Sequence, residues 1–105
     1  MTQALQPDDR VLILQPERHG SLRLREWSRA LPQGLLVGVG EQSVIRNARR
    51  ELADCENALF ASGSRAEIPW RDGFFTVIVD VETGPATPDM LRVLHPAGRI
   101  YSIEP

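Results

Sequence analysis

The sequence contains no lysine, and all 12 of its basic residues are arginines. They are outnumbered by 14 acidic residues, which leaves a formal net charge of −2. A chain with this balance lacks the broad positive potential that attracts nucleic acids or anionic membrane surfaces. The composition therefore argues against both kinds of partner, and we expect neither.

Cysteine and histidine are also scarce. Cys55 is the single cysteine, so an intrachain disulfide is excluded. His19 and His95 stand far apart in the sequence, and neither belongs to a group with the spacing of metal ligands. We therefore expect no metal site.

Long apolar runs are missing as well. No segment approaches the roughly 20 apolar residues that a membrane-spanning helix needs. The amino terminus has neither the basic flank nor the apolar core of a secretory signal peptide. These absences predict a cytoplasmic protein.

What remains is the composition of an ordinary globular domain, with 42% hydrophobic and 25% charged residues. A length of 105 residues suits one domain with a single core. We expect that domain to span residues 1–105, with the polar residues 1–9 forming a flexible lead-in.

The most informative stretch runs from Phe74 to Val81 and reads FFTVIVDV. A strand with one face in water would alternate between polar and apolar residues, and this stretch does not. Buried parallel strands have such continuous apolar runs because both of their faces are covered. The pattern therefore predicts a central strand of a parallel sheet.

Apolar runs alternate with helix-start signals along the rest of the chain. The runs predict four further strands, at Val11 to Leu14, Leu35 to Val39, Ala58 to Ala61 and Arg99 to Glu104. Capping residues predict three helices, which begin at Ser21, Ser43 and Thr87. Strands that alternate with helices imply a parallel sheet with right-handed crossovers.

Apolar spacing assigns an inward face to the first two helices. In the first helix, it consists of Leu24, Trp27 and Leu31; in the second, of Val44, Ala48 and Leu52. The second helix also carries three arginines on its other face, Arg46, Arg49 and Arg50. They are either a solvated helix face or a patch that binds anions.

Two segments resemble class I S-adenosylmethionine-dependent methyltransferases of the type-11 group. Residues 69–76 read PWRDGFFT, where these proteins have Pro-Phe-x-Asp-x-x-Phe-Asp before their fourth strand. Residues 92–98 read RVLHPAG, where the family has Arg-Val-Leu-Lys-Pro-Gly-Gly before its fifth strand. The chain is similar to this family over residues 10–105.

The resemblance implies a Rossmann-like three-layer α/β/α sandwich with a mostly parallel sheet in the strand order 3-2-1-4-5. A nucleotide would lie at the switch in strand order between the first and fourth strands, against the carboxyl ends of the strands. We expect the family's terminal antiparallel hairpin to be lacking, because the sequence stops after the fifth strand.

The resemblance also implies a cofactor loop after the first strand. The family has three alternating glycines there, and this chain has Gln15, Glu17 and His19, with Gly20 one place late. Glycines let the backbone approach the ligand closely, whereas a Cβ would collide with it. Pro16 also lacks an N–H group that the loop could donate. The loop is therefore predicted to be degenerate.

Two further cofactor positions are substituted. The family's carboxylate that binds the ribose is replaced by Gly40, and Glu41 follows one place later. Glu41 could swing into the site, but successive side chains of an extended segment start on opposite sides, so we expect it to start from the far side. The aspartate that binds adenine is replaced by Ser64. Each lost charge-assisted hydrogen bond costs about 1.5–3 kcal/mol, so the affinity is expected to be near millimolar or weaker.

Asp80 and Glu82 follow the central strand, where family members place catalytic or substrate-facing groups. Two carboxylates at this place could act as a general base. The alternative is that they cap the turn before Gly84. His95 is expected to face solvent, and Trp70 to pack beside the sheet.

Three functions remain open. The first is a methyltransferase-like domain that has lost catalysis and acts as a binding or assembly module without a cofactor. The second is a minimal methyltransferase that binds S-adenosylmethionine through Gly20, Gly40 and Glu41. The third is a non-catalytic subunit of a heteromeric methyltransferase.

Assembly is the last expectation. If the fifth strand lies at the edge of the sheet, its backbone N–H and C=O groups are open to pairing. No lysine, internal proline or evident bulge blocks the segment of Ile100, Tyr101 and Ile103. We therefore expect a homodimer that joins two such edges about a two-fold axis.

Overall fold

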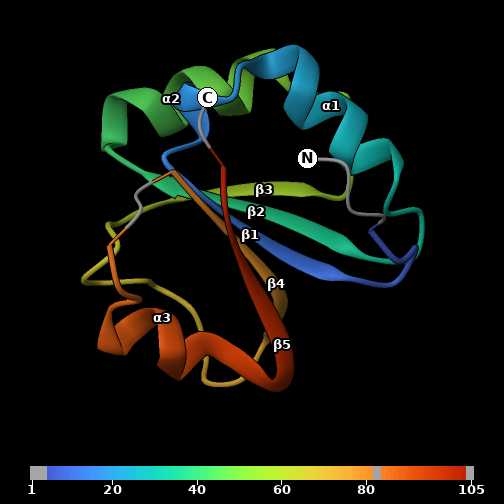
Figure 1. Ribbon diagram of the computed structural model, residues 1–105. Coiled ribbons are helices and arrows are strands. Elements are labelled where there is room, and N and C mark those ends of the chain that lie inside the picture. Colours follow the sequence, from blue (N-terminus) through green and yellow to red (C-terminus); the bar gives the residue numbers. More distant parts are fainter. Residues whose placement is uncertain (1–4, 82–83, 104–105) are drawn as a thin grey trace.

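The computed structural model describes residues 5–81 and 84–103, which form one five-stranded sheet with strand order β3-β2-β1-β4-β5 (Figure 1). All four strand pairs are parallel. The elements are β1 (Arg10–Leu14), η1 (Pro16–Arg18), α1 (Ser21–Arg29), β2 (Leu35–Gly40), α2 (Gln42–Glu51), β3 (Ala58–Ser62), β4 (Phe75–Asp80), α3 (Pro88–Val93) and β5 (Leu94–Ser102). The predicted fold class and strand order are confirmed.

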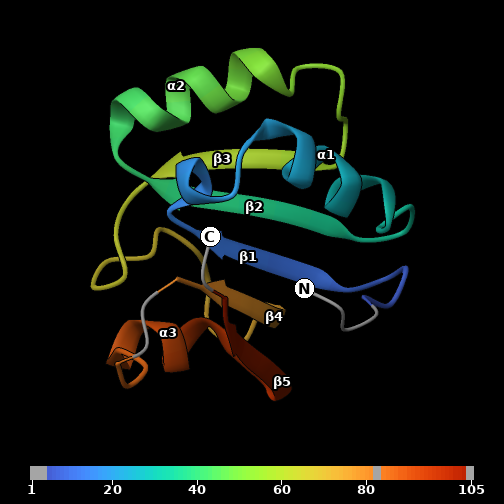
Figure 2. The same cartoon turned by 45° about the horizontal axis from the view of Figure 1, so that its top comes forward.

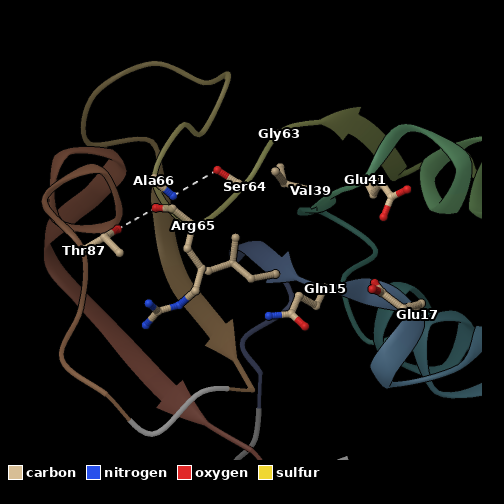
Figure 3. A pocket seen from close by; sticks show the side chains of 10 residues that line it. Gln15, Glu17, Val39, Glu41, Gly63, Ser64, Arg65, Ala66 and Thr87 are labelled. Atoms are coloured by element: carbon tan, nitrogen blue, oxygen red, sulfur yellow. Dashed lines mark hydrogen bonds between the residues drawn. The ribbon is translucent and has the colours of Figure 1, made fainter.

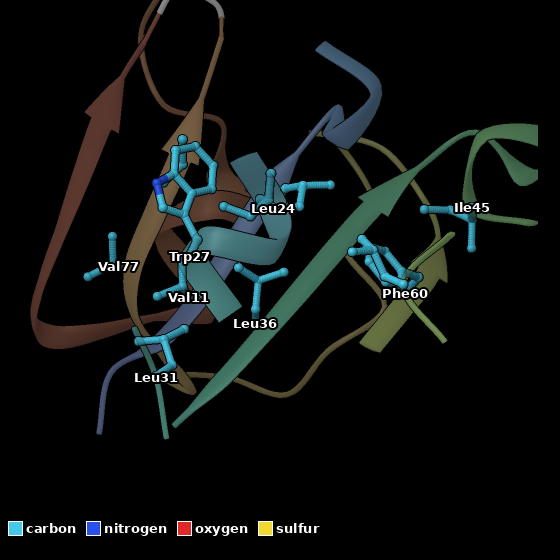
Figure 4. Close-up of a cluster of buried hydrophobic side chains, with 11 residues drawn as sticks. Val11, Leu24, Trp27, Leu31, Leu36, Ile45, Phe60 and Val77 are labelled. Atoms are coloured by element: carbon cyan, nitrogen blue, oxygen red, sulfur yellow. The ribbon is translucent and has the colours of Figure 1, made fainter. Parts of the chain in front are cut away.

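Helices cover both faces of the sheet, which gives the three layers. Helices α1 and α2 lie on one face and α3 lies on the other (Figures 1 and 2). The core beneath α1 and α2 includes Leu24, Trp27, Leu31, Leu36, Ile45 and Phe60 (Figure 4). The core beneath α3 includes Leu12, Val37, Phe75, Ile78 and Met90. The sheet is therefore buried on both sides, as the continuous apolar run of β4 predicted.

The expected starts of α1 and α2 need correction. Ser21 and Ser43 lie inside the helices, and the N-cap positions are Gly20 and Glu41, neither of which makes a side-chain capping bond. Thr87 does cap α3, because its Oγ1 accepts a hydrogen bond from the backbone N–H of Met90 at 3.1 Å. A serine or threonine therefore predicted the N-cap position correctly only at Thr87, where Pro88 and Asp89 also favour a helix start.

The inward face of α2 is the expected one in part. Leu52 is buried and Ala48 packs against the core, as predicted, whereas Ile45 is buried in place of the half-buried Val44. On the outward face, Arg49 donates a hydrogen bond of 2.8 Å from Nη2 to the carbonyl of Phe60 in β3. Strand β3 lies at the end of the sheet, so this guanidinium satisfies a backbone acceptor of an edge strand.

Residues 6–9 of the expected lead-in are tied to the sheet, and residues 1–4 lie outside the described residues. Asp9 is buried and accepts hydrogen bonds from the N–H of Gln6 and the hydroxyl of Thr76, both at 2.8 Å. Its carbonyl accepts the N–H of Leu35 at 3.1 Å. A polar segment can be ordered in this way when its polar atoms replace water as partners of the adjoining strands.

Strand β5 begins earlier than expected, at Leu94, so His95 lies in a strand and is half-buried. Its pairing with β4 is irregular: Leu94 pairs with Phe75, and the register then shifts before Arg99 pairs with Val77. The irregularity lies before Arg99, so the pairing of Ile100 and Tyr101 is regular, as expected for that segment. The predicted end at Glu104 lies outside the described residues.

Arg92, the first residue of the RVLHPAG segment, fastens the loop before β4 to α3. Its guanidinium donates to Asp89 at 2.7 Å, to Asp72 at 2.7 Å and to the carbonyls of Trp70 and Ile68, both at 2.8 Å. Asp89 in turn accepts the N–H of Ile68. One side chain therefore holds both ends of the loop, which gives this position a structural role.

We predict that Asp89→Asn weakens the dependence of stability on acid pH. The hydrogen bond from Arg92 lowers the pKa of Asp89 from 3.8 to about 2. The folded protein therefore binds this proton less readily than the unfolded chain, and the resulting stabilisation, complete well above the unfolded-state pKa of 3.8, is lost as the pH falls towards 2. Urea denaturation at pH 2 to 5 should give a shallower decline for Asp89→Asn. Replacement of the exposed Glu56 by Gln should leave the wild-type decline unchanged, and identical slopes for all three proteins would contradict the prediction.

No helix in the described ranges 5–81 and 84–103 is long and apolar enough to cross a membrane.

Candidate functional site

A cleft of about 640 Å³ opens at the carboxyl ends of β1, β2 and β3 (Figure 3). Its walls come from the ends of the strands, from the loop after β3 and from the cap of α3. The lining residues are Leu14, Gln15, Glu17, Val39, Glu41, Gly63, Ser64, Arg65, Ala66 and Thr87. This is the edge of the sheet at which nucleotides bind in open parallel folds.

The first wall is the turn after β1. Gln15 has φ 51° and ψ 62°, a left-handed conformation that glycine adopts without strain and other residues adopt rarely. The backbone therefore keeps a glycine-like conformation at the first substituted position. The next three residues form the 3-10 turn η1, so the segment is shorter and more compact than an open loop.

Pro16 fills the space beneath this turn. It is buried, and a Cβ built on Gly38 or Gly40 would lie 3.3 Å from its ring in either case. Gly40 therefore makes room for the proline, whereas Gly38 makes room first for the ring of Phe60, which its Cβ would approach to 2.6 Å. Gly40, expected at the cofactor site, instead packs beneath the turn.

The seven positions predicted for the cofactor are only partly brought together. Gln15, Glu17, Glu41 and Ser64 line the cleft. Gly20 lines a separate groove between α1 and α2, and Gly40 is buried. The expectation that Glu41 starts from the far side is wrong, because β2 ends at Gly40 and the chain turns at Glu41 into α2.

His19, the seventh position, lies away from the cleft. It is buried, and its ring packs on Trp27 with the ring centroids 5.2 Å apart. Among the described residues, neither ring nitrogen has a hydrogen-bond partner. Burial lowers the pKa of His19 below 6.5, and the charges of Arg23 and Arg18 lower it further. This histidine is therefore a neutral core residue.

We predict that His19→Phe makes the domain less sensitive to mild acid. Because its pKa is lowered by folding, the unfolded chain takes up the proton first, and stability falls as the pH drops below about 6.5. Phenylalanine keeps the contact with Trp27 and does not titrate. Denaturation curves between pH 7 and pH 5 should therefore shift less for His19→Phe than for the wild type. His95→Phe is the matched control. If the denaturation curve of His19→Phe moves between pH 7 and pH 5 as much as that of His95→Phe, the prediction is contradicted.

The two hydroxyl groups in the cleft are already engaged. Ser64 Oγ accepts the N–H groups of Ala66 and Glu67, both at 3.2 Å. Thr87 Oγ1 donates to the carbonyl of Arg65 at 2.6 Å (Figure 3). These bonds fix the loop after β3, so neither group resembles a preformed contact for adenine.

Asp80 is ion-paired at the end of β4. Its carboxylate is buried, and Arg65 approaches it with Nη2–Oδ2 at 2.6 Å and Nε–Oδ2 at 3.0 Å. A carboxylate paired in this way does not resemble a general base waiting for a substrate proton. Glu82, the other catalytic candidate, lies outside the described residues.

Arg65 was missed by the sequence interpretation. It stands two places after Gly63 in a loop without a motif, and β3 and β4 are separated in the sheet by β2 and β1. The one available signal is that parallel strands end at the same edge of the sheet, so the loop after β3 and the end of β4 lie on the same edge.

Trp70 and Cys55 contribute to packing and to hydrogen bonding of the fold. Trp70 packs beside the sheet as expected, with its ring 5.7 Å from that of Phe74. Cys55 is a half-buried free thiol that accepts a weak hydrogen bond from Arg25 at 3.6 Å. No group of three or more possible metal ligands occurs within the part of the chain that the structure describes.

The cleft fits S-adenosylmethionine poorly. The cofactor needs an open backbone after β1, and here Pro16 and the 3-10 turn are folded onto β2. Two carboxylates, Glu17 and Glu41, stand at one wall, where they would repel the carboxylate of the methionine moiety. The guanidinium of Arg65, which lines the cleft and lies against Asp80 at the end of β4, would repel the positively charged sulfonium. Glu41, at the end of β2, offers a carboxylate that suits the ribose hydroxyls.

Comparison with solved structures identifies the fold. A methyltransferase from Aquifex aeolicus, described as SAM-dependent, superposes with TM-score 0.71 and 15% identity, covering 90% of this chain and 54% of the other. The YcgJ protein from Bacillus subtilis gives TM-score 0.67 and 21% identity, covering 90% and 43%. A complex between the Trm112 methyltransferase activator of Haloferax volcanii and a candidate methyltransferase gives TM-score 0.69 and 23% identity, covering 92% and 45%. The chain therefore has the class I methyltransferase fold.

These similarities concern the fold alone, since the sequences are distant. No protein-family model and no curated protein matches the chain. The chain spans about half the length of the solved structures with which it superposes.

Proposed function

We propose that this methyltransferase-like domain does not transfer methyl groups and acts as a binding or assembly module. The observation that carries the proposal is the ion pair of Arg65 and Asp80, which occupies the end of β4 where the reacting group would lie. The compact turn at Gln15 and Pro16 supports it, because it removes the open backbone on which the cofactor depends. The same proposal places the chain in the cytoplasm, where the single thiol of Cys55 would remain reduced.

Thermal-shift titrations with S-adenosylmethionine and with S-adenosylhomocysteine test this proposal. A ligand that binds only the folded state raises the melting temperature in proportion to the logarithm of its concentration above Kd. We expect no shift up to millimolar concentration of either compound. Saturable stabilisation at micromolar concentration would refute the proposal, as would methyl transfer by the purified protein.

A minimal methyltransferase is the second candidate, and one observation favours it. Glu41 lines the cleft at the end of β2, where a carboxylate can accept hydrogen bonds from the ribose hydroxyls. In that case, Glu41→Gln should weaken binding of S-adenosylmethionine at least about tenfold, because a charge-assisted hydrogen bond is lost. The exposed Glu56→Gln is the matched control. An equal affinity of both variants would remove Glu41 from the site.

Assembly through β5 is a further part of the proposal. Among the described residues, β5 pairs with β4 on one side only. Ile100, Tyr101 and Ile103 are half-buried there and would bury more apolar surface in a dimer that joins two β5 strands. The irregular register near Leu94 leaves the regular part, from Arg99, open to such pairing. Light scattering at tens of micromolar should therefore give a dimer, and Tyr101→Pro should make it a monomer. A monomeric wild type, or a dimer unaffected by Tyr101→Pro, would contradict this proposal.

A heteromeric role is the alternative form of assembly. One superposed structure is described as a methyltransferase activator bound to a candidate methyltransferase, so proteins of this fold do form heteromers. Co-purification of a full-length methyltransferase with the tagged chain would support this role. Recovery of the chain alone from cells that express both would count against it.

A further inference from the structure

The ion pair of Asp80 and Arg65 is built from distant parts of the sheet. Asp80 ends β4 at the switch in strand order and is 1% exposed. A carboxylate buried to this degree is costly unless a cation is held against it. The cation comes from the loop after β3, on the far side of β2 and β1.

The pairing is side-on and places Arg65 between the carboxylate and the cleft. Arg65 Nε lies 3.2 Å and 3.0 Å from Oδ1 and Oδ2 of Asp80, and Nη2 lies 2.6 Å from Oδ2. Arg65 is one of the residues that line the cleft, whereas Asp80 is not. In Figure 3, the Arg65 side chain runs from the loop towards β4 along the cleft wall.

The loop holds Arg65 firmly in this place. Nη2 also donates to the carbonyl of Pro85 at 3.3 Å, and the Arg65 carbonyl accepts the Thr87 hydroxyl at 2.6 Å. Thr87 is itself fixed, because it caps α3 through the N–H of Met90. The guanidinium is therefore positioned by the segment between β4 and α3 as well as by its own loop.

We infer that Arg65 is an internal substitute for a cationic ligand at Asp80, and that its side chain closes the cleft at the end of β4. The ligand class for this site is a small organic cation, such as a guanidinium, an ammonium or a sulfonium. The inference rests on the proposed function, because it names one of the contacts that keep the cleft from binding the cofactor. Removal of the side chain should take the guanidinium away from the buried carboxylate, which still accepts the N–H of Val81, and should enlarge the cleft beside it.

Chemical rescue tests the first half of the inference. Arg65→Ala should melt at a lower temperature than the wild type, and millimolar methylguanidinium should raise its melting temperature saturably by several degrees. Wild type should not respond, and neither should Arg65→Ala/Asp80→Asn, in which no buried charge remains. Sodium chloride and urea at equal concentrations are the solvent controls. If Arg65→Ala does not fold alone, the readout is recovery of its far-ultraviolet circular dichroism on adding methylguanidinium. Absence of any response to methylguanidinium would overturn the inference.

Nucleoside ligands test the second half. Calorimetry with Arg65→Ala, stabilised where necessary by low temperature, compares S-adenosylmethionine with the uncharged thioether S-adenosylhomocysteine. We expect at least about tenfold tighter binding of the sulfonium compound, because a charged partner strengthens a contact with a carboxylate. The preference should vanish in Arg65→Ala/Asp80→Asn.

The results of these experiments test the role of Arg65 separately from the proposed function. Equal affinity of Arg65→Ala for the two compounds would overturn the claim that Arg65 closes the cleft to a cation. If neither compound binds because the turn at Pro16 still excludes the nucleoside, the methylguanidinium titration decides that claim. Micromolar binding of S-adenosylmethionine by the wild type would instead overturn the proposed function, and the methylguanidinium experiment would still decide the cation site.

Discussion

Truncation of Arg65 to alanine is expected to lower the free energy of unfolding by about 3–5 kcal/mol, the range observed when a buried ion pair loses one partner. Asp80→Asn should cost less, roughly 1–2 kcal/mol. The asymmetry arises because the carboxylate is 2% exposed, whereas the arginine side chain is 17% exposed and long enough to turn its charge towards water. Urea denaturation of both variants at neutral pH measures the two values.

An apolar replacement of both residues is the control for this prediction. Arg65→Met/Asp80→Leu should fall within about 1 kcal/mol of the wild type, because the desolvation of two charges is removed together with their attraction. A double variant as unstable as Arg65→Ala would show that the loop needs the ion pair for its shape. Equal losses in Arg65→Ala and Asp80→Asn would contradict the asymmetry.

Phe75→Ala is expected to cost about 3–5 kcal/mol, the range for loss of a buried phenylalanine. Phe75 is fully buried at the start of β4, and its ring lies 5.0 Å from the ring of Phe74 and 5.8 Å from that of Trp70. The loop over these rings is fastened by Arg92, so it cannot easily collapse into the cavity. Leu22→Ala is the matched control, because Leu22 is 72% exposed and its loss should change stability by less than about 0.5 kcal/mol. A loss below about 1.5 kcal/mol for Phe75→Ala would show that the site repacks.

The architecture could be predicted because its signals are local and agree with one another. The apolar run of β4 predicted a doubly covered strand, and the segments around Arg92 placed it in a known strand order. Thr87, Pro88 and Asp89 predicted the start of α3 correctly because three independent preferences coincide there. Ser21 and Ser43 failed because one favourable residue does not fix where the backbone enters a helix.

The candidate site was predicted less well, since its geometry depends on contacts across the sheet. Comparison of the chain with the cofactor motifs of the family identified Gln15, Glu17 and Ser64, which do line the cleft. It could not show that Pro16 packs on the glycines of β2, or that Arg65 reaches Asp80 from a loop beyond two other strands. It also misplaced Glu41, because alternation of side chains ends where a strand turns into a helix.

The strand order has a consequence for how the chain folds. Strand β1 pairs on one side with β2, which follows it closely in the sequence, and on the other side with the distant β4. The hydrogen bond from the N–H of Arg10 to the hydroxyl of Thr76 spans 66 positions. During synthesis, the β3-β2-β1 half can form while the second edge of β1 is still unpaired. Closure of such a long loop slows folding, and the open apolar edge is exposed to aggregation in the interval. Refolding should therefore be limited by the arrival of β4 at β1.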